Sequence, residues 1–226
     1  MNKSRKIVAF TAIVFFLTVI AGLTRAFAQV EDDENGNKRI FSVGVIGGAN
    51  FCQVDGDNFA GYYKAGLNFG GIAYAKVRKN TALSFEILYS QKGAQSKLGR
   101  FGNLDSNLYI NKYGTNLVYA EVPVMINFFD QHRSHAGIGL AYGRLISSSE
   151  SVNTTPVNNI DFTKYPFKKS DYQLIAGAQL HLVKGLFLNL RFQYSLVPIR
   201  TTIPPNISRA SQYNNIWTVR LMYLFI

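Results

Sequence analysis

Apolar and polar residues alternate with a period of two from Arg39 to the end of the chain, and this alternation constrains the fold more than any other feature. It is clearest from Leu186 to Leu196, where leucine and aromatic side chains occupy every second position. The opposite face of this segment carries Phe187, Asn189, Arg191, Gln193 and Ser195. A helix would mix the two sets, whereas a strand places them on opposite faces. The pattern therefore predicts a β-strand with one apolar and one polar face.

The same alternation predicts eight strands along the chain. Five have a clear pattern, near residues 83–90, 118–128, 173–182, 186–196 and 217–225, and three glycine-rich ones lie near residues 40–51, 63–76 and 135–147. Short turns are expected near residues 78–80, 130–134 and 183–185, and longer polar links near residues 52–62, 93–114, 148–169 and 197–213. Short turns that alternate with long loops are typical of outer-membrane barrels, whose turns lie in the periplasm. We expect an all-β fold, an eight-stranded antiparallel up-and-down transmembrane β-barrel.

The N-terminal segment has the three parts of a secretory signal peptide. A basic start is followed by an apolar run from Ile7 to Leu23 and by Ala26-Phe27-Ala28, a cleavage signal of small residues. We expect residues 1–28 to be the signal peptide, with an uncleaved membrane anchor as the alternative. A flexible leader is expected at residues 29–38 and the barrel domain at residues 39–226. Beyond the leader no apolar run is long enough for a transmembrane helix, so a membrane-spanning chain would cross with strands.

The charge and the cysteine content narrow the range of partners. The formal net charge is +11, and removal of the four basic residues of the signal peptide leaves +7. An exported protein does not meet nucleic acid routinely, so attraction to anionic lipid headgroups is the simpler explanation of this charge. Cys52 is the only cysteine, which excludes an internal disulfide. The expected partners are outer-membrane lipid and, through the loops, another envelope protein or a surface ligand; no nucleic acid and no cofactor are expected.

Alternation alone also fits a soluble barrel of the lipocalin type, with apolar residues inside. Three features favour the membrane-embedded form. The chain ends inside its last strand, the polar faces are rich in glycine, which suits a narrow lumen, and aromatic residues lie near strand ends, as membrane-interface girdles require. These aromatic residues are Tyr89, Phe128, Phe129, Tyr172, Tyr194 and Trp217.

Four strings of the sequence are distinctive: Phe41–Phe51, Phe85–Gly93, Tyr119–Val124 and Lys184–Phe192. Through these four strings the chain resembles the PorT-like outer-membrane barrel family of Bacteroidetes, and the resemblance covers residues 40–226. The resemblance implies an eight-stranded barrel in the outer membrane. The founding member is linked to a secretion system that exports proteases, but most relatives have no assigned role, so the resemblance carries the fold and the location only. One departure is that Phe225 is penultimate and Ile226 last, whereas such barrels often end in an aromatic residue.

Four charged residues fall on the polar faces of the predicted strands: Glu86, Glu121, Arg191 and Arg220. Paired carboxylates can perform acid–base chemistry. However, the interior of an eight-stranded barrel is just wide enough to be filled by side chains, and an unpaired buried charge there is very costly. We therefore expect all four to face inward and to form a structural lumen network, in which arginine–carboxylate contacts join opposite walls.

Other candidate sites have simpler explanations. His132 and His135 could hold a metal, but they lie in an expected turn with no third ligand. His181 could be a base in the lumen, although an interior histidine with satisfied hydrogen bonds is the simpler expectation. The glycines Gly44, Gly47 and Gly48 lack the strand-to-helix context of a phosphate-binding loop and are better explained as strand glycines that relieve crowding. No catalytic, cofactor or metal residue is predicted.

Two classes of function remain. The first is a non-enzymatic barrel with a structural or interaction role through its extracellular loops, whose specific process is unassigned. An accessory role in a Bacteroidetes protein secretion system is an alternative within this class. The second is a lipid-modifying or proteolytic barrel enzyme, which needs a histidine near the outer rim, and the expected outer loops contain none. A small-solute pore is disfavoured by the size of the barrel.

Overall fold

A computed structural model describes residues 40–59, 61–96, 101–102, 109–155, 160–202, 204 and 207–225. The expected signal peptide and leader lie outside these residues. The strands are β1 (Phe41–Asp57), β2 (Lys64–Arg78), β3 (Thr81–Gln95), β4 (Phe101–Gly102), β5 (Tyr109–Phe129), β6 (His135–Thr155), β7 (Ser170–Val183), β8 (Leu186–Ser195) and β9 (Ser208–Phe225). A short 3-10 helix, η2, spans Phe162–Lys164. In the described part of the chain no helix has the length and apolar character needed to cross a membrane.

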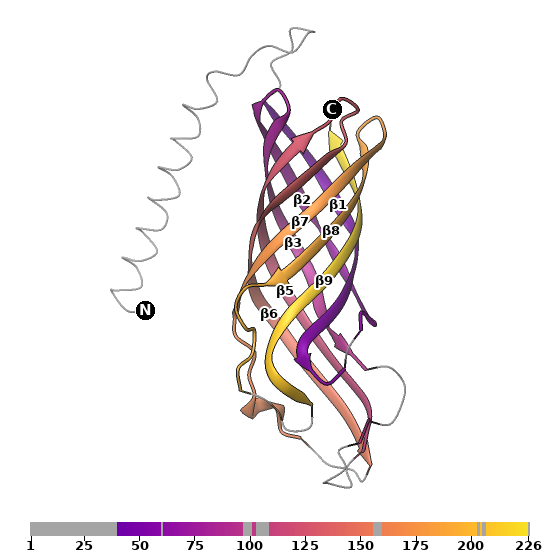
Figure 1. The fold of residues 1–226 in the computed structure, drawn as a ribbon, viewed down its shortest axis with the longest axis vertical. Helices are drawn as coiled ribbons and strands as arrows, with labels where there is room; N and C mark the ends of the chain where they lie inside the picture. The colour runs from indigo at the N-terminus through magenta and orange to yellow at the C-terminus, as the bar shows by residue number, and fades with distance from the viewer. Residues whose placement is uncertain are drawn as a thin grey trace, which may run out of the picture.

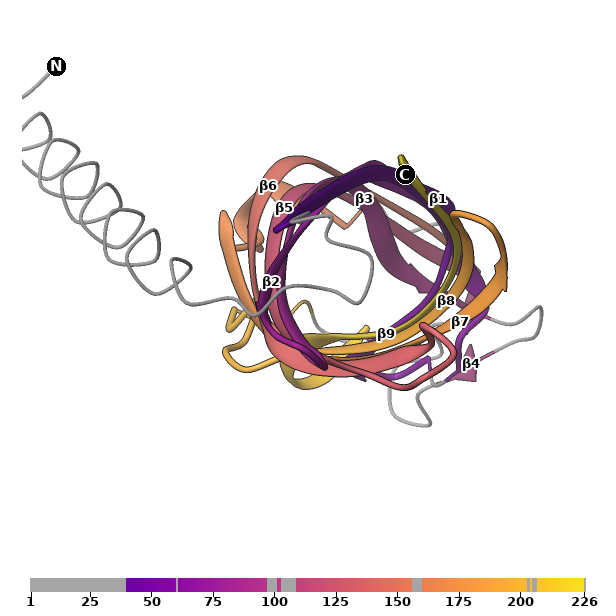
Figure 2. The same ribbon diagram turned by 90° about the horizontal axis from the view of Figure 1, so that it is seen from above.

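Eight long strands close into a ring. Each of them pairs antiparallel with its neighbour in the chain, β3 pairs directly with β5, and β1 pairs with β9 to complete the circle (Figure 2). The two-residue β4 only adds to the edge of β5, where Phe101 pairs with Ile110. The structure confirms the predicted eight-stranded antiparallel up-and-down barrel. It follows that no long strand has an open edge along the closed part of the ring.

The two ends of the barrel differ in the length of their connections. Residues 79–80, 130–134 and 184–185 form the three short turns, and they lie at the same end as the C-terminus (Figure 1). We call this the turn end. The longer connections and η2 lie at the opposite end, which we call the loop end (Figure 1). Short and long connections alternate as the sequence predicts.

The outer surface of the ring carries an apolar band. Outward-facing apolar side chains follow the strands, for example over eleven residues from Val118 to Phe128 on β5 and from Tyr172 to Leu182 on β7, and over nine residues from Trp217 to Phe225 on β9. Strands of this length are those that cross a bilayer. The band is the surface that hydrocarbon chains contact, and it excludes the lipocalin-type arrangement, in which apolar side chains would face inward.

Most of the predicted girdle residues lie near strand ends as expected: Tyr89, Tyr172, Tyr194 and Trp217 toward the loop end, and Phe128 at the turn end. Cross-strand ring pairs join Tyr142 to Tyr172 and Phe192 to Trp217, with centroids 5.4 and 5.0 Å apart. Phe129 is an exception to the prediction. It is the last residue of β5 and lies on the inward face of that strand. Its ring stacks on the His135 ring inside the barrel, with centroids 4.1 Å apart.

The strands at the loop end are longer than the sequence predicts. β5 and β6 have 21 residues each, and residues 109–117 pair with residues 148–155 beyond the apolar band. The predicted links at 52–62, 93–114, 148–169 and 197–213 therefore contain strand residues at their margins. The physical reason is that an outward side chain beyond the lipid need not be apolar, so the alternation that reveals a strand is lost there.

Candidate functional site

The first charged cluster lies in the barrel interior and joins Glu86 of β3 to Arg191 of β8 and Arg220 of β9. Arg191 Nη1 donates to Glu86 Oε2 at 3.0 Å, and its Nη2 bonds the other carboxylate oxygen. Arg220 Nη1 lies 3.4 Å from Glu86 Oε2. All three residues are at most 1% exposed. The two-pronged contact is the geometry in which arginine binds a carboxylate most strongly.

Amide side chains hold Arg220 in place. Arg220 Nε and Nη2 donate to Asn189 Oδ1 at 3.0 and 2.8 Å, and Nη1 donates to Asn68 Oδ1 at 2.9 Å. Gly48 lies beside it on β1, where a Cβ atom would be 2.6 Å from Arg220 Cα. The strand glycine is therefore needed for the close approach of β1 and β9 at this point.

A second cluster lies closer to the loop end and centres on Lys92 of β3. Lys92 Nζ forms an ion pair with Glu121 of β5 and lies 3.7 Å from Asp171 Oδ2 of β7. Ser195 Oγ donates to Asp171 Oδ1 and Asn214 Nδ2 to Asp171 Oδ2, both at 2.8 Å. One lysine thus serves two carboxylates, and neutral donors bond both oxygens of Asp171, while Glu121 Oε2 has no hydrogen-bond partner among the described residues.

The four predicted lumen residues have different charged partners in the structure. All four face the interior and are buried, and Glu86 contacts both arginines. The predicted network pairs Glu121 with an arginine as well, but the structure places its carboxylate against Lys92 instead. Lys92 is absent from the predicted network because the predicted third strand ends near residue 90. The period of two, continued from Glu86 through Ser90, would have placed Lys92 inward.

The buried charges of the two clusters balance. The carboxylates are Glu86, Glu121 and Asp171, and the cations are Lys92, Arg191 and Arg220. Buried charges are costly unless each has an opposite charge and hydrogen bonds close by. Balance across the two clusters is therefore a condition for burying six ionised groups in one narrow lumen, and the arrangement leaves no excess charge there for a substrate or an ion.

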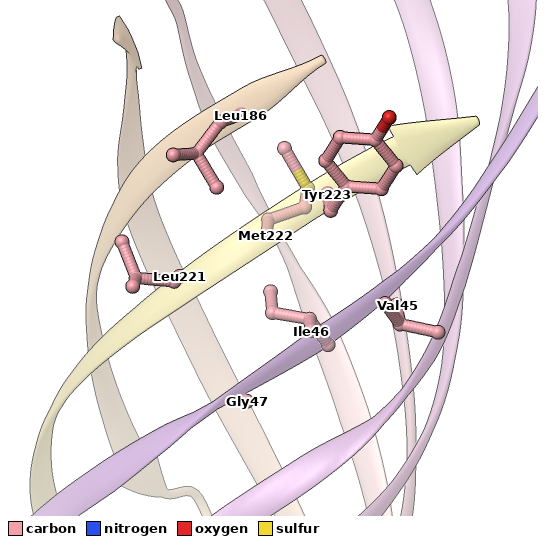
Figure 3. A pocket seen from close by; sticks show the side chains of 7 residues that line it. All are labelled: Val45, Ile46, Gly47, Leu186, Leu221, Met222 and Tyr223. Carbon is pink, nitrogen blue, oxygen red and sulfur yellow. The ribbon is translucent and has the colours of Figure 1, made fainter. Parts of the chain in front are cut away.

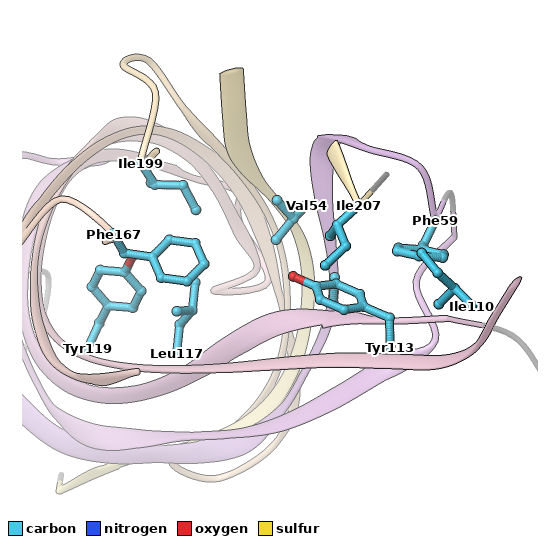
Figure 4. Close-up of a cluster of buried hydrophobic side chains, with 10 residues drawn as sticks. Val54, Phe59, Ile110, Tyr113, Leu117, Tyr119, Phe167, Ile199 and Ile207 are labelled. Carbon is cyan, nitrogen blue, oxygen red and sulfur yellow. The ribbon is translucent and has the colours of Figure 1, made fainter. Parts of the chain in front are cut away.

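Apolar clusters lie at both ends of the lumen. A loop-end cluster contains Val54, Phe59, Ala94, Ile110, Tyr113, Leu117, Tyr119, Phe167, Ile199 and Ile207. Figure 4 shows Phe167 and Ile199, which come from two connections, pointing over Tyr119 and Leu117 of β5. A turn-end cluster contains Ile46, Ile72, Tyr74, Ala82, Leu88, Phe187, Met222 and Leu224. The charged clusters are thus enclosed between two apolar caps.

A buried ion pair fastens the loop-end cap. Arg200 Nη1 donates to Glu150 Oε1 at 2.9 Å, its Nη2 bonds Oε2, and the Tyr113 hydroxyl donates to Glu150 Oε1 at 2.8 Å. The Arg200 guanidinium carbon also lies 3.6 Å from the centre of the Phe167 ring. Burial, and then the Glu150 charge, raises the pKa of Tyr113, so its hydroxyl stays protonated and remains a donor. We call Arg200, Glu150 and Tyr113 the latch.

A buried carboxyl lies beside this cap. Asp57, at the end of β1, is six residues beyond Phe51, the last large outward apolar residue of that strand. Its Oδ1 accepts a hydrogen bond from the Phe59 amide at 2.8 Å. Burial raises the pKa of Asp57 to about 7, and the Phe59 bond opposes the shift.

The three histidines lie near the turn end and do not converge. His132 is exposed, whereas the buried His135 ring bonds the Tyr74 hydroxyl at 2.9 Å. His181 packs on Phe187 with ring centroids 5.0 Å apart, and its Nε2 has no hydrogen-bond partner among the described residues, contrary to the expectation of a satisfied ring. Within the described ranges, no group of three or more metal-ligating side chains occurs.

A shallow pocket lies on the outer face of the ring (Figure 3). It is lined by Val45, Ile46, Gly47, Leu186, Leu221, Met222 and Tyr223. The lining side chains are apolar apart from the Tyr223 hydroxyl, and Val45, Leu221 and Tyr223 belong to the apolar band. The pocket therefore suits a lipid hydrocarbon chain.

A closed ring of eight strands with an apolar outer band and a polar, charged interior defines a transmembrane β-barrel of the outer-membrane class. Residues 27–200 match the family described as outer membrane protein beta-barrel domain, and the chain belongs to that family. Its location is the outer membrane. No curated protein sequence matches the chain.

Solved outer-membrane proteins are similar at low identity. The attachment invasion locus protein Ail of Yersinia pestis is 11% identical, with 82% of this chain and 99% of that chain covered and a TM-score of 0.44. Neisserial surface protein A is 12% identical, with 82% and 97% covered and a TM-score of 0.43. The outer membrane protein OprG of Pseudomonas aeruginosa is 9% identical, with 82% and 94% covered and a TM-score of 0.39.

Proposed function

We propose that this protein is a closed, non-enzymatic barrel that displays its loop end on the cell surface and acts there as an interaction scaffold. One observation carries the proposal. Charge-balanced clusters occupy the lumen between two apolar clusters, while the paired segments 109–117 and 148–155 extend beyond the apolar band. Ordered strand structure therefore continues outside the lipid at the loop end, and the occupied lumen favours a closed barrel.

The orientation follows from the connections. Outer-membrane barrels have short turns on the periplasmic side and longer loops outside. The turns at 79–80, 130–134 and 184–185 would then face the periplasm, and the latch and loop-end cluster would face the exterior. Signal-peptide cleavage after Ala28 belongs to the same proposal, because a periplasmic N-terminus needs export.

The arrangement argues against an enzyme at the outer rim. Hydrolytic barrels that use a histidine base need it close to the surface on which substrate arrives. His132, His135 and His181 account for every histidine of the chain, and all three lie near the turn end. The carboxylates of the two clusters are held in ion pairs inside the closed lumen.

Membership in the PorT-like group is the finer proposal. Two of the strings that carry the resemblance supply the lumen network: Phe85–Gly93 contributes Glu86 and Lys92, and Tyr119–Val124 contributes Glu121. The resemblance thus rests on residues with a physical role inside the barrel. The resemblance supports a shared fold and a shared lumen, and it does not identify a binding partner.

Cysteine labelling and conductance test the proposal together. Cysteines at Ser148 and Lys164, both exposed at the loop end, should react with a membrane-impermeant maleimide on intact cells, and cysteines at Asn80 and Lys184 should not. Native Cys52 is fully buried and serves as the silent background. Purified protein in planar bilayers should show no steady conductance. Labelling from the turn end or a stable open channel would overturn the proposal.

A further inference from the structure

The outer face of the β6–β7 pair changes from apolar to basic within a few residues. From the turn end to the loop end, the outward pairs are Ala136 with Ala178, Ile138 with Ala176, Leu140 with Leu174, Tyr142 with Tyr172, and Arg144 with Ser170. The tyrosine pair marks the edge of the apolar band. Arg144 is the next outward residue beyond it, at the level where lipid headgroups begin.

Two lysines, Lys168 and Lys169, immediately precede Ser170, the residue that pairs with Arg144. The Leu145 amide donates to the Lys169 carbonyl at 2.9 Å, so the segment before β7 runs alongside β6 at this height. Lys168, Lys169 and Arg144 are all exposed. We call these three residues the basic patch.

Among the described residues the basic patch has no anionic partner. None of the ion pairs in the described part of the chain includes one of its three residues. The flanking positions are apolar: Ala120 of β5 pairs with Arg144, and the Leu196 amide bonds the Tyr172 carbonyl on the other side. Cations this close along the backbone repel one another, and an anion from outside the described part of the chain would compensate them.

We propose that the basic patch binds the phosphate groups of a phosphorylated glycolipid in the outer leaflet. Arginine binds phosphate through two parallel hydrogen bonds, and the lysines add point charges. The tyrosine pair would lie at the membrane interface, and the apolar ladder below it would contact the acyl chains. The inference rests on the orientation proposed above, because only an outward loop end brings this patch into the outer leaflet.

Lipid binding by purified protein tests the inference. The probe is fluorescent lipopolysaccharide that carries its phosphates, added to the protein purified from outer membranes in a neutral detergent at fixed salt. The test variant is Arg144→Gln/Lys168→Gln/Lys169→Gln. The matched control, Lys112→Gln/Lys164→Gln/Arg209→Gln, removes the same charge from exposed residues of the loop end away from the patch. Each variant must first migrate faster unheated than boiled, which shows that the barrel has folded.

We expect the patch variant to bind on the order of 100-fold more weakly, because each basic residue near an anionic surface contributes about a fivefold factor. The control should stay within about threefold of the native protein. Lipopolysaccharide stripped of phosphate should bind the native protein as weakly as the intact lipid binds the patch variant, and millimolar inorganic phosphate should not compete. Equal losses in both variants, undiminished binding of the stripped lipid, or full competition by free phosphate would each overturn the inference. Because binding in detergent does not depend on membrane orientation, a wrong orientation would appear in the labelling experiment alone.

Discussion

Arg191 on β8 and Glu86 on β3 meet across the lumen, with Arg191 Nη1 3.0 Å from Glu86 Oε2. In the order of the ring these two strands stand opposite each other, so the ion pair ties the two walls together. Arg220 approaches the same carboxylate from β9. One carboxylate therefore compensates two buried guanidinium groups, and its removal should have the largest effect of any single change in this cluster.

Glu86→Gln should reduce the free energy of unfolding by roughly 3–5 kcal/mol, because it leaves two buried cations without a carboxylate. Arg191→Met should also be destabilising, and the double variant should lose less than the sum of the two single losses, because the paired charges are removed together. Urea unfolding in lipid vesicles, followed by the fluorescence of Trp217, the only tryptophan, measures all three. The exposed pair Lys164–Asp161 provides the control, since Lys164→Gln should change stability by less than about 1 kcal/mol. Strictly additive losses would contradict the pairing.

The second cluster allows a test of specificity. Lys92→Met should be strongly destabilising because Glu121 and Asp171 lose their shared cation. Adding Glu121→Gln should restore part of the loss, whereas adding Glu86→Gln should deepen it, since Glu86 belongs to the other cluster. The same unfolding assay compares the two double variants. Equal rescue by both would show that the lumen behaves as one pool of charge.

The sequence predicted the barrel well and its loop end poorly, for one physical reason. Where a strand crosses lipid, every outward side chain must be apolar, so the period of two is visible, as from Val118 to Phe128. Beyond the lipid that requirement ends. Residues 147–151, Ser-Ser-Ser-Glu-Ser, are strand in the structure although their composition indicates a loop.

The sequence predicts which charged residues point into the lumen, but it predicts less well which of them pair with each other. Parity alone places Glu86, Glu121, Arg191 and Arg220 inside the barrel. The pairing of carboxylates with cations depends on how the strands are staggered relative to one another. The periodicity of a single strand does not reveal this stagger. The partner of Glu121 is Lys92, which lies beyond the predicted end of the third strand.

Asp57 should give the stability of the loop end a characteristic pH dependence. Its pKa in the folded protein is raised to about 7 by burial, against 3.8 for the ordinary carboxyl. Between these values the folded state binds more protons than the unfolded state, so stability falls as the pH rises from about 4 to about 7 and is level above that. The total loss is at most about 4 kcal/mol. Asp57→Asn should remove this dependence, as seen by comparing urea unfolding of the two proteins at pH 4.5 and pH 8.

Asp161 provides a control of opposite sign. Hydrogen bonds from Thr163 lower the pKa of this exposed carboxyl. Its contribution to folding stability is therefore present above the ordinary pKa of an aspartate and is lost as the pH falls through the lowered pKa. Asp161→Asn should therefore leave the loss of stability between pH 4.5 and pH 8 in place. If Asp57→Asn keeps the native pH profile, the buried carboxyl is not its source.

Gly93 should not tolerate a side chain. Its φ of 137° is disfavoured for L-residues, and a Cβ atom there would lie 2.1 Å from the Thr115 carbonyl oxygen. Gly93→Ala should cost roughly 1–3 kcal/mol and should also disturb Lys92, the preceding residue. Gly71→Ala is the matched control, because a Cβ at that exposed strand position meets only ordinary contact at 3.9 Å. The result to measure is the urea midpoint; equal midpoints for the two variants would argue against strain at Gly93.

The latch should decide how firmly the loop-end cap is closed. Arg200 holds Glu150 of β6, and the Lys168 amide bonds the Ile199 carbonyl at 2.7 Å, so the two connections over the lumen are fastened to each other and to the wall. Arg200→Met leaves Glu150 without its cation, and Glu150→Gln leaves Arg200 without its anion. Trypsin cleavage after Lys164 and Lys168 should then be at least about tenfold faster, since cleavage follows the population of the locally open state.

The barrel itself should survive these changes, because the two charged clusters lie below the cap and keep their own pairs. Both variants should therefore still migrate faster unheated than boiled, and neither should conduct ions in planar bilayers. Lys112→Met, which alters an exposed residue of β5, should leave cleavage unchanged. Native cleavage rates in both latch variants would show that the apolar contacts of Phe167 and Ile199 are sufficient to hold the cap. A steady conductance in either variant would show that the cap, rather than the charged clusters, is what closes the lumen.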